Sequence, residues 1–512
     1  MYAAQLQNYM TVLHARRIDS AGRCEVLLRM NTVMTRAHRP IYLKLADELS
    51  ELLETGQLKA GDRLPSVRRL VVQKGVSATT AVAALRDLEH RGFAVAKPQS
   101  GYFAKPCRVD VDEPVTTRPP PAPHTVGIDS IMVQLIDASQ NPRIASLGTA
   151  IPDADLFPMH RLQKVLSALA RRNPRLLGEY SPHYYGVESL RRELLRRYAD
   201  LGCGVAPDEI VVTNGCTEAL NLALRCVTRP GDSVALESPV FYGVLQVLQH
   251  LGLKALEIPT HPRDGLRIEA LETALKGRAG RKVKACLVSA NFSNPTGACL
   301  SDTDKERLVH LCAHRGVTLI EDDIYGDLQH LGSRPLPAKT FDTSGNVILC
   351  SSFSKTLAPG ARIGWLCGGR FSKALRLGKF ASSGPTAAIL QELVAELLRS
   401  GGYERHLAKL RNTYARQVVQ TAAAVSRYFP QGTRMTQPRG GFVIWVELPK
   451  RLDSLSLFEA AIRQGVNFAP GPLFSATGRY RNFLRLNCGR RMTPELDAAL
   501  GRLGRLAIRA CT

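Results

Sequence analysis

One lysine lies where its amine could do covalent chemistry. Lys355 follows a short apolar run, 347–350, and belongs to a serine-rich turn that precedes Gly360. This is the carboxyl end of a predicted strand, where ligands bind in open α/β sheets. An amine held there could add to an aldehyde. Because a single lysine in a turn is usually solvated, its neighbours must decide between the two interpretations.

Two other segments supply the partners that such an amine would need. Asp322 and Tyr325 follow a predicted strand, 318–320, and Asn294 opens an Asn-Pro-Thr-Gly segment, 294–297. A carboxylate that faces a pyridine nitrogen keeps that nitrogen protonated, which makes the ring an electron sink. The side chains of Tyr325 and Asn294 can both donate hydrogen bonds to a phenolic oxygen on the same ring.

An anion site is predicted beside them. Cys216 and Thr217 follow a glycine and open a helix after the predicted strand 210–213. Backbone amides at a helix N-terminus attract phosphate. Arg362 could add a cation to this site, and Ser352 a hydroxyl donor.

The elements that must position these residues alternate from about residue 145 onward. Short apolar runs are separated by helical or turn segments, which is typical of a mostly parallel sheet covered by helices. The runs are 210–213, 233–236, 285–288, 318–320 and 347–350. From about residue 372 the pattern changes to one long helical stretch, 387–429, a strand within 441–448 and a compact α+β end. The expected fold class is α/β with a smaller C-terminal subdomain.

The order and separation of the three motifs resemble those of the fold-type I, PLP-dependent aminotransferases. The resemblance covers 145–510, inside a domain predicted at 126–512. It implies pyridoxal 5'-phosphate (PLP) as the cofactor and Lys355 as the catalytic lysine that forms a Schiff base with it. The cofactor-binding residues that the resemblance implies are Lys355, Asp322, Tyr325, Asn294, Ser352, Arg362, Cys216, Thr217, Phe241 and Tyr180.

Three further roles follow from the same resemblance. Phe241 matches the aromatic residue that stacks on the ring; the family more often has Tyr or Trp there, and the neighbouring Tyr242 leaves a shift of one residue open. Tyr180 resembles the tyrosine that reaches the partner subunit's phosphate, which implies a homodimer. Arg485 matches the arginine that binds the substrate's α-carboxylate as a two-pronged fork.

A second, smaller unit is predicted near the start of the chain. Helices are expected at 40–56, 66–73 and 78–91, followed by a hairpin at 93–105. Ser66 and Ser77 stand where N-caps would begin the second and third helices. Three helices and a hairpin make a winged helix-turn-helix.

This unit, 39–106, resembles the GntR-type winged helix, which implies double-stranded DNA as a partner. The resemblance rests on Arg-Pro-Ile-Tyr (39–42), Gly-Asp-Arg-Leu-Pro-Ser (61–66), Gly-Val-Ser (75–77) and Ser-Gly-Tyr-Phe (100–103). Residues 36–105 carry 12 Lys and Arg against 7 Asp and Glu, a net charge of about +5. The candidate DNA contacts are Arg63, Ser66, Arg68, Ser77, Thr79, Thr80, Lys97 and Gly101. The family usually has arginines where this chain has Ala78 and Val82, so Arg63 and Arg68 must contribute more.

Two segments flank this head. Residues 1–38 show no clear periodicity and read as a weak helix, a disordered arm or an extension before a start at Met34. Residues 107–125 contain five prolines and predict a semi-rigid spacer of at most about 60 Å, at ~3.1 Å per residue. An edge strand is disfavoured at that proline density.

Bulk composition sets outer limits. The chain has 512 residues and a formal net charge of +23. This favours a polyanionic partner, usually nucleic acid, although a basic enzyme from an arginine-rich genome would show it too. The 12 cysteines form no Cys-x-x-Cys pair, so neither a metal site nor a disulfide framework is indicated and a cytoplasmic location is the default. No apolar run is long enough to span a bilayer.

A GntR-type head joined by a linker to an aminotransferase-like body is the organisation of the MocR-type regulators. The resemblance implies a PLP-dependent, DNA-binding transcriptional regulator that senses an amino acid or related amine. The alternative is an active aminotransferase with a secondary DNA-binding head. A scaffold without cofactor is disfavoured because Lys355, Asp322 and Asn294 are all present.

Overall fold

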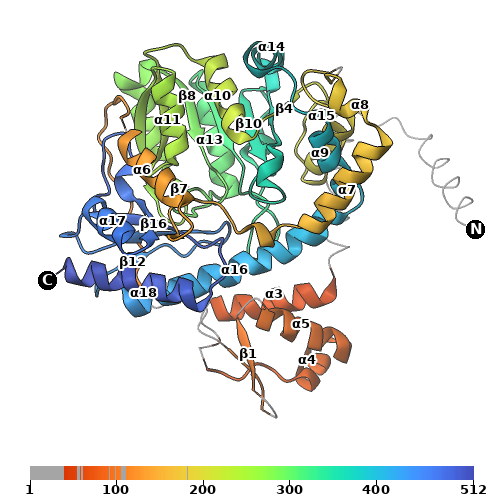
Figure 1. The fold of residues 1–512 in the computed structure, drawn as a ribbon, viewed down its shortest axis with the longest axis vertical. Helices are drawn as coiled ribbons and strands as arrows, with labels where there is room; N and C mark the ends of the chain where they lie inside the picture. Colours follow the sequence, from red (N-terminus) through yellow and green to blue (C-terminus); the bar gives the residue numbers. More distant parts are fainter. Residues whose placement is uncertain are drawn as a thin grey trace, which may run out of the picture. The chain divides into compact units, whose positions relative to one another are not determined.

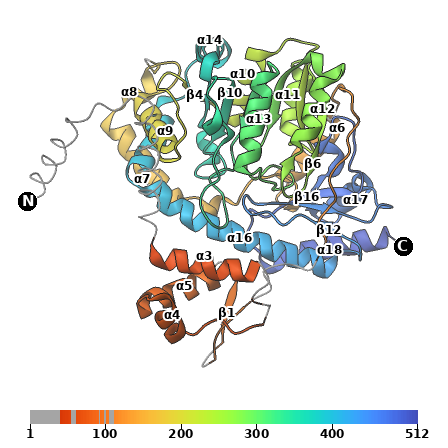
Figure 2. The same ribbon diagram turned by 180° about the vertical axis from the view of Figure 1, so that it is seen from behind.

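The computed structural model describes most of the chain as two compact units, Met1–Lys105 and Pro106–Thr512, shown in Figures 1 and 2. The described residues are 40–54, 58, 61–90, 93–97, 100–104, 111–127, 129–181 and 183–511. The arm expected at 1–38 lies outside them. No helix in these ranges is both long and apolar enough to cross a membrane.

The smaller unit is a winged helix-turn-helix. Its elements are α3 (Ile41–Glu54), α4 (Val67–Lys74), α5 (Ala78–His90), β1 (Ala94–Lys97) and β2 (Gly101–Ala104). The Ser66 hydroxyl accepts a hydrogen bond from the Arg69 amide and so caps α4, whose end is formed by Gly75 in a left-handed conformation. The Ser77 hydroxyl caps α5 in the same way through the amide of Thr80, at 3.1 Å. Both caps were predicted because the sequence signal for them is local.

The core of this unit is apolar and small. Helix α3 packs on α5, and α4 packs on α5. The buried side chains come from all three helices, the turn before α4 and the hairpin with the residue before it: Leu45, Leu49, Leu64, Leu70, Ala81, Ala84, Leu85, Leu88, Phe93 and Ala104. Strands β1 and β2 pair antiparallel, with Ala94 opposite Ala104.

The larger unit is built on an eight-stranded sheet in the order β4-β11-β10-β9-β8-β5-β6-β7. The strands are β4 (Ile210–Thr213), β5 (Ser233–Ser238), β6 (Lys254–His261), β7 (Gly265–Leu266), β8 (Val283–Val288), β9 (Thr318–Asp322), β10 (Val347–Ser352) and β11 (Gly364–Cys367). Strand β7 runs antiparallel to β6, and β11 runs antiparallel to both β10 and β4. The other described pairs in this sheet are parallel. All five predicted runs are strands, and β5, β8 and β9 consist almost entirely of buried residues.

Helices cover both faces of this sheet (Figures 1 and 2). The helices that pack on its strands are α10 (Cys216–Val227), α11 (Tyr242–His250), α12 (Ile268–Lys276), α13 (Asp302–His314) and α14 (Ser372–Ser383). Beside the sheet, α7 (Met159–Arg172), α8 (Arg175–Gly178) and α9 (Glu188–Asp200) pack with α15 (Ala388–Arg399), which is followed by α16 (Gly402–Tyr428). The helical stretch predicted at 387–429 consists of two helices, because the chain turns at Gly401, whose φ is +64°. Helix α16, light blue in Figure 1, runs from α15 to the small subdomain.

The small subdomain has a four-stranded sheet in the order β12-β13-β16-β15. Its elements are β12 (Arg434–Met435), β13 (Val443–Glu447), α17 (Ser454–Arg463), β14 (Val466–Asn467), β15 (Ala469–Pro470), β16 (Phe483–Asn487) and α18 (Pro494–Arg509), joined by α6 (Asp129–Gln140) and β3 (Ala145–Ser146). Strand β3 pairs with β14. Since α14 and α15 pack with α10, α7 and α9 beside the large sheet, this subdomain begins later than the predicted 372 and includes an N-terminal part.

The described part of the proline-rich segment is attached to the large unit. The His124 amide and carbonyl both bond to Ala255 in β6, at 2.9 Å, and the Thr117 amide donates to the Thr260 carbonyl at 3.1 Å. Glu113 forms an ion pair with Arg263 at 2.7 Å. The prediction of a spacer over the whole of 107–125 was therefore wrong from residue 111 onward. Pairing at an edge tolerates prolines as long as other residues supply the amides, and Thr117 and His124 do so.

Helices α16 and α18 pack closely, and two glycines of α18 differ in how near they lie to α16. A Cβ at Gly504 would lie 2.3 Å from the Tyr428 carbonyl oxygen, whereas at Gly501 the nearest atom, 3.5 Å away, is the end of the flexible Arg505 side chain. We expect Gly504→Ala to destabilise the protein by about 1–3 kcal/mol because the two helices must separate. Gly501→Ala should stabilise it by about 0.5–1 kcal/mol through helix propensity. Urea unfolding of both variants checks this, and equal effects would contradict the packing.

Candidate active site

The candidate site forms where the parallel strands of the large sheet end. Asp322 is the last residue of β9 and lies opposite Cys350 of the neighbouring β10, five residues before Lys355. Asn294 follows β8 on the other side of β9. From the small subdomain, Arg485 of β16 donates from Nη1 to the Asn294 side-chain oxygen at 3.1 Å. The structure therefore brings together four residues that lie far apart in the sequence.

The Lys355 amine is held by a main-chain oxygen, and no carboxylate among the described residues forms an ion pair with it. Its Nζ donates to the Ala150 carbonyl at 2.7 Å. Burial, together with the nearby Arg485 and Arg362 cations, lowers the pKa of Lys355 to about 8, while Asp322 opposes the shift. A pKa of 8 leaves about a tenth of the amine neutral at pH 7, far more than an ordinary lysine. A neutral amine is the form that adds to an aldehyde.

Asp322 is a buried carboxyl group with few stabilising partners. Burial raises its pKa to about 6. The Cys216 thiol donates to its Oδ1 at 3.4 Å, and the Ile324 amide donates to the same oxygen at 3.2 Å. A buried carboxylate gains from a cation placed against it, so a protonated ring nitrogen would suit this position.

Tyr325 and Asn294 are also buried and lie together. Their side chains are hydrogen-bonded, and burial raises the pKa of Tyr325 above its usual range. The Arg485 guanidinium bonds to Asn294 and to the Gly148 carbonyl, and its Nε is buried without a partner among the described residues. Arg485 itself is fully buried. These three side chains form one donor cluster around the end of β9.

The anion site is predicted at the first main-chain amides of α10, and Arg362 lies beside them. The Cys216 thiol faces Asp322, so from Cys216 only the main-chain amide at the start of α10 remains for a phosphate. Thr217 is exposed in the first turn of the same helix. The Arg362 guanidinium lies against Gly215 and donates to the Asn214 carbonyl at 3.0 Å. A Cβ at Gly215 would approach Arg362 to 2.5 Å, so the glycine is what allows the cation this close to the helix N-terminus.

Two serines in the lysine turn behave differently. The Ser352 hydroxyl is buried and accepts from the Ser354 amide at 3.1 Å. The Ser354 hydroxyl is buried without a partner among the described residues. Sequence reasoning named Ser352 and missed Ser354, although both flank Phe353 in the motif. A phosphate oxygen would give the Ser354 hydroxyl the acceptor it needs.

The aromatic residues at the site are adjacent in sequence and in space. Phe241 precedes α11 and is half-buried, and its ring centroid lies 4.7 Å from that of the buried Tyr242. The Arg485 guanidinium lies 5.8 Å from the Tyr242 ring. Tyr180 is 89% exposed and does not join the described site residues. A role for Tyr180 would therefore need a group from outside this chain.

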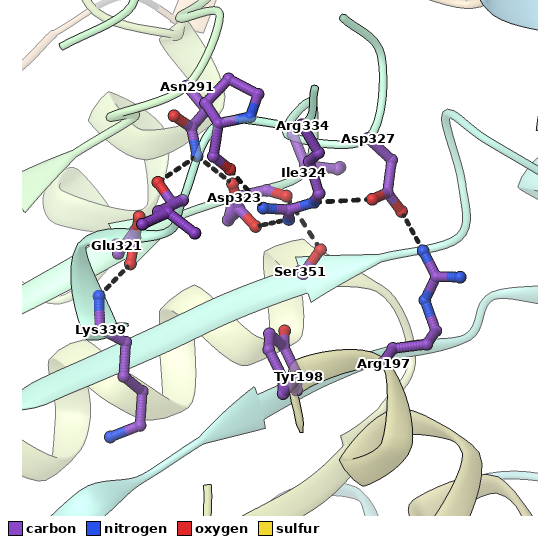
Figure 3. Close-up of polar contacts among 12 residues, drawn as sticks. Arg197, Tyr198, Asn291, Glu321, Asp323, Ile324, Asp327, Arg334, Lys339 and Ser351 are labelled. Atoms are coloured by element: carbon purple, nitrogen blue, oxygen red, sulfur yellow. Dashed lines mark hydrogen bonds and ion pairs between the residues drawn. The ribbon is translucent and has the colours of Figure 1, made fainter. Parts of the chain in front are cut away.

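A buried ion-pair network holds the loop that carries Tyr325 (Figure 3). Arg334 pairs with Asp323 through Nη2 and with Asp327 through Nε, the latter at 2.7 Å. Arg197 of α9 pairs with the other oxygen of Asp327 at 2.9 Å. Asp323 and Asp327 stand two residues before and after Tyr325, so the cations fix both sides of it.

The same network reaches two more elements. The Asn291 amide group donates to Asp323 at 2.8 Å and so ties in the loop that carries Asn294. The Tyr403 hydroxyl of α16 donates to Asp327 at 2.9 Å. Although burial opposes it, Arg197 and Arg334 hold the pKa of Asp327 well below its usual range. Sequence reasoning missed this network; the only signal was the second carboxylate of the Asp-Asp pair.

In the smaller unit, the predicted DNA contacts fall into three groups. The hydroxyls of Ser66, Ser77 and Thr80 are hydrogen-bonded within their own helix caps. Arg68 and Thr79 are exposed. The other three residues, Arg63, Lys97 and Gly101, lie at the hairpin: a Cβ on Gly101 would meet the Arg63 guanidinium at 3.7 Å, and the Lys97 amine lies 4.5 Å from the Phe103 ring. The exposed groups are those free to approach a duplex.

Comparison with protein families matches both units. Residues 154–503 match the family described as aminotransferase class I and II, and residues 41–103 match that described as bacterial regulatory proteins, gntR family. The uncharacterized HTH-type transcriptional regulator YdcR of Escherichia coli is 37% identical over 467 residues, 91% of this chain and 98% of its own length.

Solved structures share the fold of the larger unit. A kynurenine aminotransferase of Pyrococcus horikoshii in complex with PMP is 28% identical, with a TM-score of 0.70 over 75% of this chain and 96% of that one. LysN, an α-aminoadipate aminotransferase of Thermus thermophilus complexed with N-(5'-phosphopyridoxyl)-L-leucine, is 29% identical, with a TM-score of 0.68 over 75% and 95%. The candidate site described above thus lies on a fold that holds pyridoxyl compounds in these relatives.

The ion-pair network should contribute strongly to stability. Arg334→Met leaves two buried carboxylates short of a cation, and we expect a loss of about 3–5 kcal/mol in the free energy of unfolding. Arg399→Met removes an exposed arginine paired with Glu396 and should cost at most about 1 kcal/mol. Urea unfolding at pH 7 measures both.

The pH dependence of that loss gives a second check. Because the folded-state pKa of Asp327 is lowered, its contribution is present above the ordinary carboxyl pKa of about 4 and fades as the pH falls below it. The difference between wild type and Arg334→Met should therefore be smaller at pH 3.5 than at pH 7. A difference that stays constant would show that packing and not charge is responsible.

Proposed function

Because the chain belongs to the class I and II aminotransferase family and carries a GntR-type head, we propose that it is a PLP-dependent transcriptional regulator of the MocR type. The head binds double-stranded DNA, and the aminotransferase-like unit binds an amino acid or a related amine. The match to YdcR over 91% of the chain includes both units, which supports a single function for the whole protein.

The class of ligand is inferred from the presence of Lys355 and Arg485 in the same site. Both cations lie at the end of the large sheet, and each is satisfied by a carbonyl of one short segment: Ala150 for Lys355 and Gly148 for Arg485. A ligand that has an amino group and a carboxylate matches the two positions, with the carboxylate taken by the guanidinium fork. An amino acid fits both, and a simple amine only one.

Ligand entry must change the structure at this segment. A carboxylate bound by both Nη atoms of Arg485 would replace the Gly148 carbonyl, and Lys355 would leave the Ala150 carbonyl in order to react. The segment continues from β3, which pairs with β14 of the small subdomain. The liganded and unliganded forms therefore differ in the contacts between the two subdomains. A ligand shifts a conformational equilibrium only through such a difference.

The residues present fit the cofactor. When bound, PLP supplies an aldehyde and a ring that withdraws electrons from the bond to be broken. Lys355 would hold the aldehyde carbon, Asp322 the ring nitrogen, and Tyr325 with Asn294 the ring oxygen. The phosphate would be held by the first amides of α10, at Cys216 and Thr217, with Ser352 and Arg362. Phe241 would cover the ring.

The assembly and the cellular location belong to the same proposal. Tyr180 is 89% exposed, and Leu177 and Phe380 are exposed by 70% and 64%; large apolar groups on a surface favour a protein contact. A homodimer in which Tyr180 reaches the partner subunit's phosphate accounts for that exposure. The described cysteines are all free thiols, which suits the reducing cytoplasm.

The alternative function is a working aminotransferase. Lys355, with its lowered pKa, and Arg485 are what transamination also requires, and the solved relatives named above are aminotransferases. The two functions differ in whether the ligand turns over rapidly and whether DNA binding responds to it.

The head should bind DNA by sequence. A DNA fragment selected for tight binding to the full chain should bind more tightly than random DNA of equal length at the same salt concentration. Arg68→Ala should weaken this binding by about 1–3 kcal/mol if the guanidinium contacts a base. Lys74→Gln is the control, because Lys74 is already paired with Glu48 at 2.7 Å. Equal affinity for selected and random DNA would reject sequence-specific regulation.

The ligand should act through Arg485. With PLP-loaded protein, an amino acid effector should change the cofactor absorbance, and Arg485→Ala should abolish that change while the cofactor band itself persists. Lys355→Ala should lose the band. For a regulator, turnover should stay far below the ordinary enzyme range of about 1–10³ s⁻¹, and the same ligand should alter DNA affinity. Rapid transamination with no effect on DNA affinity would instead favour the aminotransferase.

A further inference from the structure

One of the linker's attachments to the large sheet is made by the side chain of Thr117. The Thr117 hydroxyl donates to the Ser238 carbonyl at 2.7 Å and accepts from the Thr260 amide at 2.9 Å. Its own amide donates to the Thr260 carbonyl at 3.1 Å. Thr117 therefore bonds to the end of β5 through Ser238 and to the end of β6 through Thr260, and joins the two strands.

Ser238, the last residue of β5, is held in place by several hydrogen bonds. It is fully buried. Its amide donates to the Thr260 hydroxyl at 3.0 Å, and its own hydroxyl donates to Glu257 at 2.9 Å and lies 2.7 Å from the Tyr480 hydroxyl. Its amide and its hydroxyl thus make three contacts with the sheet and the small subdomain. The fourth contact, on the carbonyl oxygen, comes from the linker.

The chain from Ser238 leads directly to the aromatic residues of the candidate site. Strand β5 ends at Ser238, and α11 begins at Tyr242, so only three residues lie between them. Phe241 is the residue immediately before the helix, and the Tyr242 ring lies 5.8 Å from the Arg485 guanidinium. A shift of the Ser238 carbonyl would move both rings, because so short a connection cannot absorb it.

We propose that Thr117 is a positioning residue for the cofactor site, and that the linker is for this reason a structural part of that site. Through Ser238, Thr117 sets the position of Phe241 and Tyr242. By reciprocity, a cofactor or ligand that moves these rings acts on the linker through the same hydroxyl. The first statement concerns the cofactor alone; the second rests on the proposed regulatory function.

The hydrogen bonds of the Thr117 hydroxyl can be removed without detaching the linker. The linker is also held by Glu113 on Arg263, by the Asp112 carbonyl on the Met435 amide and by His124 on β6. Loss of the Thr117 hydroxyl would leave those contacts in place. It would also leave the Thr260 amide without its acceptor, and an unsatisfied buried group is costly. The expected response is therefore a local rearrangement at the strand ends.

The chain offers a matched set of variants. Thr117→Val keeps the shape and removes the hydroxyl, whereas Thr117→Ser keeps the hydroxyl. Thr116→Val makes the same chemical change at the neighbouring residue. Titration of cofactor-free full-length protein with PLP, followed by absorbance and by the circular dichroism of the bound cofactor, reads out the site without any turnover.

We expect Thr117→Val to raise the dissociation constant for PLP about three- to tenfold, the effect of one lost hydrogen bond, and to change the circular dichroism of the cofactor. Thr117→Ser and Thr116→Val should match wild type within about twofold, an effect too small for a lost hydrogen bond. Wild-type affinity and dichroism in Thr117→Val would overturn the proposal. So would an equal effect of Thr116→Val, because the linker as a whole would then be responsible.

The second arm measures coupling to DNA. For each variant, the ratio of DNA affinities with and without a saturating amino acid effector is compared with that of wild type. Thr117→Val should bring this ratio close to one and leave the DNA affinity of the unliganded protein unchanged. A wild-type ratio carried over intact would refute the coupling. If wild type itself shows a ratio of one, the proposed regulatory function fails and the coupling with it, while the PLP titration still decides whether Thr117 positions the site.

Discussion

Parallel pairing of β9 with β10 is the constraint on which the site depends. The pairing sets Asp322 opposite Cys350, so both strands leave the sheet at the same edge and the lysine turn begins beside the carboxylate. Strand β8, on the other side of β9, delivers Asn294 to that edge as well. Strand β11 runs the other way and returns the chain toward β4, which places Arg362 against the N-terminus of α10. Asp322 therefore lies at a strand end, and Asn294, Tyr325 and Lys355 lie in the loops that follow such ends.

The charges near this edge fall into two kinds. Asp327 is surrounded by cations, and its pKa is lowered. Asp322 and Lys355 are also buried, but their pKa values move toward neutrality, to about 6 and about 8, because burial outweighs the charges near them. Groups of the first kind are satisfied within the protein. Groups of the second kind are left short of partners, which is the pattern expected where a ligand is to supply the missing interaction.

The features that could be predicted from the sequence are those that depend on residues close together in the chain. The five apolar runs became strands, and Ser66 and Ser77 cap their helices, because periodicity and capping need only a few residues. The break between α15 and α16 also has a local signal, in Gly401 and Gly402, although the prediction gave only the helical stretch as a whole.

The remaining features depend on contacts across the fold. Ala150 acts on Lys355 through a carbonyl, which every residue type carries, from 205 positions away. A cation for the buried Asp323 could be expected, but only the fold selects Arg334 from 68 lysines and arginines. The amides at the start of α10 could be predicted as a phosphate site, but that the Cys216 thiol faces Asp322 depends on how α10 packs against β9.

The composition of the linker explains why so few groups attach it and why each one matters. Prolines lack an amide hydrogen, so along the edge of β6 only residues such as Thr117 and His124 can pair. Between these two residues lie four prolines, which stiffen the backbone and limit how far one attachment can move independently of the other. A glycine-rich linker would absorb a shift at Ser238 within its own dihedral angles. A proline-rich one, held at both points, passes the shift along the chain.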